Sequence, residues 1–268
     1  MIVSRIARGA RSGRGASARH LALVAAATLV VAGCGTKDAA DPLQPSGPIG
    51  RIRFVNLITD PARNPVNVIL EGIPFGVNLA YTQSTPATLP APSTANYAAV
   101  LAGDRSIVLK RTADTTVTVG TLNVSITASN DYTVFATGGT GGSAVSAFVT
   151  GDVNTAPATG QARIRVVNMS PTAGAVDVFI TAANADLATA TPVATALANR
   201  TIFAGASVAP GTYQIRTVPA GTAAAARTAA VNTNLTGVVV AAGNGRTIII
   251  ADAPAGGAPL RSFQLTDQ

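Results

Sequence analysis

The chain has 268 residues, of which only 12% are charged and 4% aromatic, and it contains no Trp. Five of its 19 basic residues precede Cys34, which leaves 14 basic residues against 12 acidic ones, so the net charge falls from +7 to about +2. This balance excludes a basic surface for nucleic acid. Short β-branched runs, broken by many of the 26 Gly and 16 Pro, predict an all-β protein.

Residues 1–33 have the three parts of a lipoprotein signal peptide. Arginines fill the first part, an apolar run from Leu21 to Ala32 follows, and the segment ends in Val31-Ala-Gly-Cys34. The apolar run is too short to span a bilayer as a mature helix. The ending resembles the bacterial lipobox, whose cysteine is diacylated and becomes the new N-terminus. We therefore predict lipidation at Cys34, with an uncleaved membrane anchor as the alternative.

Residues 34–50 are predicted to form a tether between the lipid and the folded part. Gly35 follows the lipidated cysteine, and because this position is not Asp, the enterobacterial sorting rule implies delivery to the outer membrane. Pro42, Pro45 and Pro48 oppose a regular helix and favour an extended segment.

Two segments of about a hundred residues then repeat one pattern, and such internal similarity indicates a duplicated domain. We place the first repeat at residues 51–152 and the second at residues 161–268. The opening strand Arg51–Asn56 recurs as Arg163–Asn168. Four further blocks match in the same order, and they pair Val66–Leu70 with Val176–Ile180, Leu101–Arg105 with Ala209–Tyr213, Thr133–Ala136 with Thr247–Ile250, and Gly141–Phe148 with Gly256–Phe263. Each repeat is long enough to bury its own core, so we expect fragments 49–152 and 161–268 to fold separately.

The blocks Arg163-Ile-Arg-Val-Val-Asn-Met-Ser-Pro171, Val176-Asp-Val-Phe-Ile180 and Pro210-Gly-Thr-Tyr213 resemble the domain of unknown function 4397 family. The first repeat departs from the pattern, because Leu57-Ile-Thr-Asp-Pro61 replaces Met-Ser-Pro and Asn67 stands where Asp177 stands. The resemblance implies two tandem Ig-like antiparallel β-sandwich domains in a bacterial envelope protein. It implies no reaction.

Composition limits the chemistry of the mature chain. The one histidine, His20, lies in the signal peptide, and Cys34 is used for lipidation, so nucleophiles activated by histidine and zinc sites of His or Cys are excluded. Paired-carboxylate chemistry remains an alternative, although Glu71 is the one glutamate. We predict no cofactor and no catalytic residue.

Several polar residues have two interpretations. Asp152 with Asn154, or Asn130 with Asp131, could bind Ca²⁺, but these residue types also suit turns. Arg53 and Arg165 are predicted to face outward, either toward a ligand or in an exposed cross-strand pair such as Arg165 with Asp177. Asn56 and Asn168 are predicted to face inward and to hydrogen-bond the backbone rather than a ligand.

Two further segments enter the predictions. The proline-rich stretch Gln83–Ala95 is either a recognition loop or a solvated connector. Phe148 and Phe263 occupy matched places, and both lie three residues after another apolar position. If both positions face one core, the final strand needs a bulge near Ala147 and Ser262, and both rings are buried between the sheets.

Together these features predict a non-catalytic envelope lipoprotein that serves in binding, adhesion or envelope structure. Its partners are the membrane, through the lipid, and a protein or a glycan. The alternative is an envelope enzyme that acts on glycan through carboxylates.

The lipid anchor is testable by Cys34→Ser. The serine variant should remain an unacylated precursor that does not partition into detergent, because acyl chains contribute ~0.8 kcal/mol per buried methylene. Detergent phase partitioning of both proteins measures this. A serine variant that stays membrane-bound after alkaline washing would show that the apolar run is an uncleaved anchor.

Overall fold

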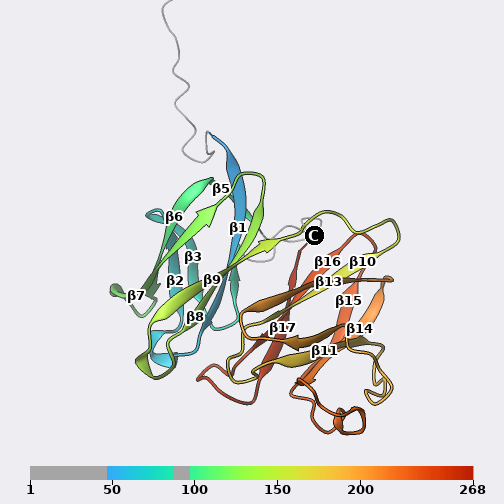
Figure 1. Ribbon diagram of the computed structural model, residues 1–268. Helices are drawn as coiled ribbons and strands as arrows, with labels where there is room; N and C mark the ends of the chain where they lie inside the picture. Colours follow the sequence, from blue (N-terminus) through green and yellow to red (C-terminus); the bar gives the residue numbers. More distant parts are fainter. Residues whose placement is uncertain (1–46, 87–96, 268) are drawn as a thin grey trace, which may run out of the picture. The chain divides into compact units, whose positions relative to one another are not determined.

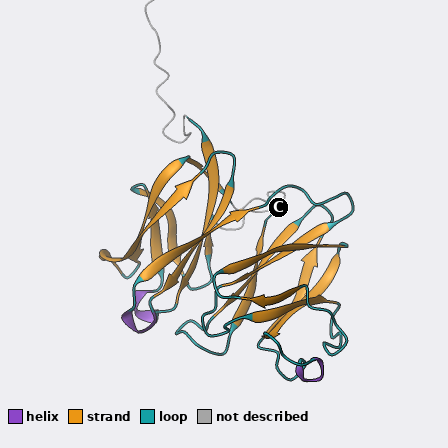
Figure 2. Ribbon diagram, in the orientation of Figure 1, coloured by secondary structure: helices purple, strands orange, loops and turns teal. Residues whose placement is uncertain are grey.

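A computed structural model describes residues 47–86 and 97–267, so Cys34 and most of the tether lie outside the described residues. Strands make up 57% of the described chain. Loops and three single-turn 3₁₀ helices, at Pro61–Arg63, Thr140–Gly142 and Ala224–Ala226, make up the rest (Figure 2). The all-β prediction is confirmed.

The first repeat forms two sheets (Figure 1). One has the strand order β4-β1-β8-β9, with β5 also pairing β1, and the other has the order β3-β2-β6-β7. The strands are β1 Ile49–Ile58, β2 Val66–Leu70, β3 Ile73–Leu79, β4 Ser84–Thr85, β5 Ala98–Leu101, β6 Gly103–Arg111, β7 Asp114–Ile126, β8 Asp131–Gly138 and β9 Val145–Asp152.

The second repeat has the same arrangement, with sheets ordered β13-β10-β16-β17 and β12-β11-β14-β15. Its strands are β10 Ala162–Asn168, β11 Val176–Thr181, β12 Ala194–Leu197, β13 Thr201–Val208, β14 Gly211–Pro219, β15 Thr233–Val240, β16 Gly245–Ala251 and β17 Arg261–Thr266. Each strand of these sheets therefore has a counterpart at the same place in the first repeat.

The sheets are mixed rather than wholly antiparallel. β1 pairs β8 in parallel, and β10 pairs β16 in parallel, while all other pairs are antiparallel. Parallel neighbours need a long connection, and the intervening sheet of each repeat supplies it.

Each repeat buries its own core between its two sheets. In the first, Ile52 and Phe54 of β1 pack with Val68 of β2 and Ile107 of β6. In the second, Ile164 and Val166 of β10 pack with Val178 of β11 and Ile215 of β14. This is the inward alternation that the apolar pattern predicts.

A third core joins the two repeats. It contains Val55 and Phe135 from the first repeat together with Val167 and Ile249 from the second, and Met169 and Leu265 extend it. These side chains lie on the outer faces of the first sheet of each repeat. Strands β1 and β10 are consequently buried on both faces, and residues 47–267 belong to one compact unit.

The predicted bulge in the final strands is wrong. Strands β8 and β9 pair without a register shift, as do β16 and β17. Val145 packs inside the first sandwich, whereas Phe148 and Phe263 are half-buried in the core between the repeats. Apolar residues three apart can face opposite sides here because both sides are covered.

The shared core predicts that the repeats depend on each other for stability. Phe135 is fully buried and stacks on Phe148, with ring centroids 6.2 Å apart. Phe135→Ala should cost about 3–5 kcal/mol in the free energy of unfolding. Urea unfolding measures this, and Ile73→Ala is the control because Ile73 is 65% exposed. Equal losses for the two variants would contradict the shared core.

Candidate functional site

Two arginines and two aspartates meet in the contact between the repeats. The side chains of Arg53 and Arg165 are each 1% exposed, and those of Asp152 and Asp267 are buried with them. Arg53 Nη2 lies 2.8 Å from Asp267 Oδ1, and Arg165 Nη1 lies 3.1 Å from Asp152 Oδ1. Each arginine thus pairs with the aspartate of the other repeat, and it also pairs with the aspartate of its own repeat, at 3.4 Å for Arg53 with Asp152 and 3.1 Å for Arg165 with Asp267.

Two threonines complete this group, which we call the inter-repeat cluster (Arg53, Thr133, Asp152, Arg165, Thr247 and Asp267). Arg53 Nε donates to Thr133 Oγ1 at 2.7 Å, and Arg165 Nε donates to Thr247 Oγ1 at 3.0 Å. The threonines are the parallel register partners of the arginines on β8 and β16. The two halves of the cluster are therefore equivalent, as in the interface of a symmetric dimer.

Charge pairing compensates for burial in this cluster. Burial by itself lowers the pKa of Arg165, but the nearby carboxylates of Asp267 and Asp152 raise it above its ordinary value. The guanidinium group of Arg165 therefore stays charged inside the protein.

The predicted exposed position of both arginines is wrong. Their strand faces do point away from the core of each sandwich, but the other repeat covers them. Asp177 does not pair with Arg165. It instead accepts hydrogen bonds from the backbone N–H of Ala196 at 2.9 Å and of Gly221 at 3.2 Å.

Tyr97 extends the cluster toward the surface. Its hydroxyl donates to Asp152 Oδ2 at 2.6 Å, and its ring lies under Arg53, with 4.7 Å from Cζ to the ring centroid. Burial raises the pKa of the Tyr97 phenol well above its ordinary value. The phenol therefore acts as a hydrogen-bond donor throughout the neutral range.

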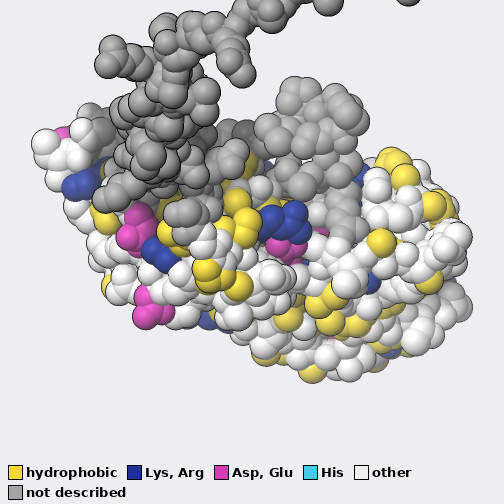
Figure 3. Space-filling view, turned by 90° about the horizontal axis from the view of Figure 1, so that it is seen from above, with side chains coloured by type: hydrophobic (Ala, Val, Ile, Leu, Met, Phe, Trp, Pro, Cys, Tyr) yellow, Lys and Arg dark blue, Asp and Glu magenta, His cyan; other side chains and the backbone are white. Residues whose placement is uncertain are grey.

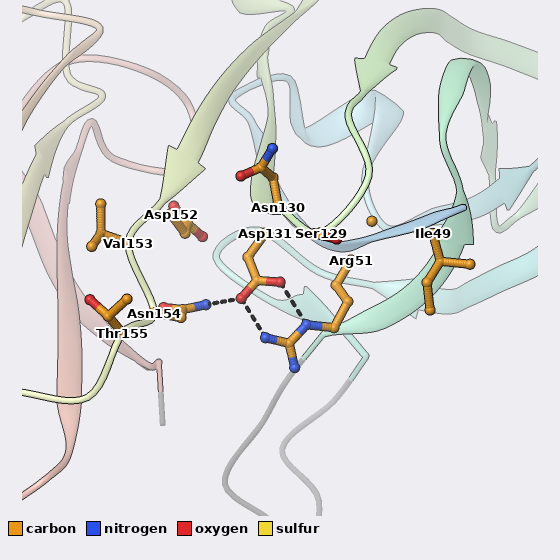
Figure 4. Close-up of a pocket in the computed structure, with 10 residues that line it drawn as sticks. Ile49, Arg51, Ser129, Asn130, Asp131, Asp152, Val153, Asn154 and Thr155 are labelled. Atoms are coloured by element: carbon orange, nitrogen blue, oxygen red, sulfur yellow. Dashed lines mark hydrogen bonds and ion pairs between the residues drawn. The ribbon is translucent and has the colours of Figure 1, made fainter. Parts of the chain in front are cut away.

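A surface pocket of about 550 Å³ lies beside Asp152 (Figure 4). The start of β1, the turn before β8 and the residues after β9 line it. Arg51 binds Asp131 through two bonds, Nε to Oδ1 at 2.6 Å and Nη2 to Oδ2 at 2.5 Å. Asn154 Nδ2 donates to the same carboxylate at 2.7 Å. In the space-filling view, acidic and basic side chains lie close together among hydrophobic and uncharged ones (Figure 3).

These contacts occupy the acidic residues that were considered for Ca²⁺. Asp131 is bound by Arg51 and Asn154, and Asp152 is bound by two arginines, so neither carboxylate is presented to Ca²⁺. Residues 47–86 and 97–267 contain no group of three or more His, Cys, Asp or Glu placed to hold a metal.

The two asparagines behave as predicted. Asn56 Nδ2 donates to the carbonyl of Leu79 at 2.9 Å, and its Oδ1 accepts from the N–H of Ile58. Asn168 Nδ2 makes the equivalent bond to the carbonyl of Leu197 at 2.9 Å. Each asparagine thus fixes the end of the first strand of its repeat, β1 or β10, to an adjacent segment of the same polypeptide.

The proline-rich stretch interrupts an edge strand. Ser84 and Thr85 form β4 beside β1, residues 87–96 lie outside the described residues, and β5 then pairs the start of β1. In the second repeat the single strand β13 covers both positions, with a bulge opposite Arg165. The stretch is thus an insertion at the bulge position, and Tyr97 at its end contacts the inter-repeat cluster.

Sequence reasoning missed Thr133, Thr247, Asp267 and the role of Asp152 in the cluster. The signal was present, because extending the ungapped match of Phe148 with Phe263 by four residues pairs Asp152 with Asp267. The pattern of one repeat does not show that a second copy covers its outer face.

Comparison with known proteins finds a family model that is similar to part of the chain. Residues 50–179, just under half of the chain, match the family model described as Domain of unknown function (DUF4397). The matched region runs from β1 into β11, so it includes both copies of the first strand. This supports the domain family that the sequence blocks resemble.

No curated protein matches the chain. Among solved structures, the C-terminal domain of AlgF from P. aeruginosa is similar over 40% of this chain and 97% of its own, with 11% identity and a TM-score of 0.25. The family CBM26 module CBMbc from Eubacterium rectale Amy13K, solved with maltoheptaose, is similar over 80% of this chain and 96% of its own, with 8% identity and a TM-score of 0.22. These likenesses are too weak to carry an argument.

Among the described residues, no helix has the length and apolar character needed to cross a membrane.

The inter-repeat cluster predicts a strong effect of removing one charge. Arg53→Met should cost about 3–5 kcal/mol in unfolding free energy, because Arg165 alone then faces the two buried carboxylates of Asp152 and Asp267. Arg111→Met is the matched control, since Arg111 and Asp114 form an exposed pair that contributes about 0–1 kcal/mol. Chemical denaturation compares them. An Arg53 variant as stable as the control would contradict the cluster.

Proposed function

We propose that this protein is a non-catalytic module of the bacterial cell envelope, held at the outer membrane by acylated Cys34 and serving in binding or envelope structure. The anchor and the location rest on the signal sequence that ends at Cys34. The folded part is a pair of β-sandwiches joined by a shared core and a buried cluster of charges. Such a body suits the presentation of a rigid binding surface.

The hydrogen bonding of the carboxylates is the observation that supports a non-catalytic role. Every described Asp or Glu side chain accepts a hydrogen bond from an arginine or from a local polar donor. These residues are Asp60, Glu71, Asp104, Asp114, Asp131, Asp152, Asp177, Asp186, Asp252 and Asp267. Hydrolysis of a glycoside needs one carboxylic acid that donates a proton and a second carboxylate facing the sugar. Carboxylates held by arginines and turn donors suit structural roles better.

An envelope enzyme acting on glycan is the second candidate, and one observation favours it. Asp131 and Asp152 are register partners on β8 and β9, and both border the 550 Å³ pocket. This places two carboxylates side by side at a cavity. Each is nevertheless bound to arginine, so neither carboxylate is free to face a sugar ring.

A hydrolase assay on the full-length protein separates the two functions. We expect no release of product from a panel of envelope polysaccharides and chromogenic glycosides above the rate without protein. The matched variants are Asp131→Asn and Asp104→Asn, because Asp104 is an exposed carboxylate on β6, away from the pocket. Turnover that is lost in the first variant and kept in the second would overturn the non-catalytic role.

A further inference from the structure

The pocket beside β1 has the size and the fixed lining of a small-ligand site. Its volume of about 550 Å³ is within the range of roughly 300–1,000 Å³ that is usual for such sites. The ion pair of Arg51 with Asp131 holds both side chains in one orientation. Arg163 Nη1 donates to the carbonyl of Val153 at 2.6 Å, so the segment that forms the opposite wall is also held.

One buried acceptor in the pocket has no donor. Asn154 uses Nδ2 to bind Asp131, because only the amide nitrogen can donate to a carboxylate. This fixes the amide orientation, and Asn154 Oδ1 is left buried without a hydrogen-bond partner among the described residues. The oxygen has almost no accessible surface, so a ligand hydroxyl satisfies it once the segment of Val153, Asn154 and Thr155 shifts to admit it.

Arg51 offers the complementary group. Its Nε and Nη2 bind Asp131, and Nη1 makes no hydrogen bond within the described residues. Its side chain is 47% exposed. The pocket thus presents a donor and an acceptor that are both held in place, which matches two hydroxyl groups of one ligand, one accepting and one donating.

The surrounding charges favour a neutral ligand. Arg51, Arg53 and Arg165 are balanced by Asp131, Asp152 and Asp267 through the ion pairs of this region. The net charge of these six side chains is therefore close to zero. Arg163, behind the opposite wall, is bound to the carbonyl of Val153 and is outside this balance. The walls include two exposed apolar side chains, Ile49 at 40% and Val153 at 54% exposed, which offer contact to C–H groups.

We propose that this pocket binds a neutral saccharide, with one hydroxyl on Arg51 Nη1, another on Asn154 Oδ1, and the ring against Val153. A sugar ring carries hydroxyl donors and acceptors around an apolar face, which is the combination that the lining offers. The inference rests on the proposed function, since it names a ligand class for a non-catalytic module.

The second repeat serves as an internal comparison. Arg163 is the counterpart of Arg51, but its parallel register partner is Gly245, whereas the partner of Arg51 is Asp131. Without that carboxylate, Arg163 binds a backbone carbonyl instead. The saccharide site is accordingly assigned to the first repeat alone.

Calorimetric titration of the full-length protein tests the proposal. The protein is kept in a detergent without a sugar headgroup, since a glycoside detergent would compete. The neutral probes are maltose, cellobiose and N,N′-diacetylchitobiose with their longer oligomers, and oligogalacturonate is the charged comparison. We expect at least one neutral probe to bind, and Asn154→Ala and Val153→Glu each to weaken it about tenfold or more, a change of ~1.4 kcal/mol.

Asn123→Ala is the matched control, because Asn123 is an exposed asparagine on β7, in the other sheet of the same repeat. It should bind like the unmodified protein, and thermal melting should show that all variants fold. Three results would overturn the proposal: no binding by any neutral probe, binding unchanged in both pocket variants, or binding of the charged probe alone. If the protein neither binds nor hydrolyses the probes, the saccharide site is wrong, but the proposed non-catalytic role still stands.

Discussion

The structure depends on the burial of two arginines and two aspartates where the repeats meet. Removing such charges from water costs several kcal/mol for each ion, and only close, well-directed partners offset that cost. Arg53 lies closest to Asp267, and Arg165 lies equally close to Asp152 and Asp267, so the two arginines share carboxylates from both repeats. The surrounding apolar core buries additional surface, but hydrophobic contacts do not depend on direction and so specify the orientation of the repeats only weakly. The charges therefore define which faces meet and in what register.

This dependence on contacts between the repeats explains which parts of the structure could be predicted from the sequence alone. The inward faces of β1 and β10 were predictable, because apolar residues alternate there with arginines. Ile52 and Phe54 face the core of the first repeat, and Ile164 and Val166 face the core of the second. Asn56 and Asn168 were also predictable, since a polar side chain on an apolar face must find backbone partners. Both conclusions need only the local pattern of one strand.

The opposite faces could not be predicted in the same way. An arginine beside valine on the outer side of a sheet is typical of solvent exposure, and nothing within one repeat shows that its copy will cover it. The pairing of Arg53 with Asp267 joins positions more than 200 residues apart, and no periodicity carries that information. The pocket was partly predictable, since Asn130, Asp131, Asp152 and Asn154 had been selected as polar candidates. Their partner Arg51 had not been, because the ion pair runs between parallel strands that are distant in the sequence.

The equivalence of the two halves of the inter-repeat cluster has an evolutionary consequence. A contact in which each partner offers the same face is the kind that two separate copies of one domain would make with each other. Covalent linkage of such copies turns a bimolecular encounter into an intramolecular one at high effective concentration, so the contact survives dilution. Once fused, the copies need no longer stay identical away from the contact. Asp131 in one half and Gly245 in the other illustrate that freedom, because an ancestral homodimer would have carried the same residue twice.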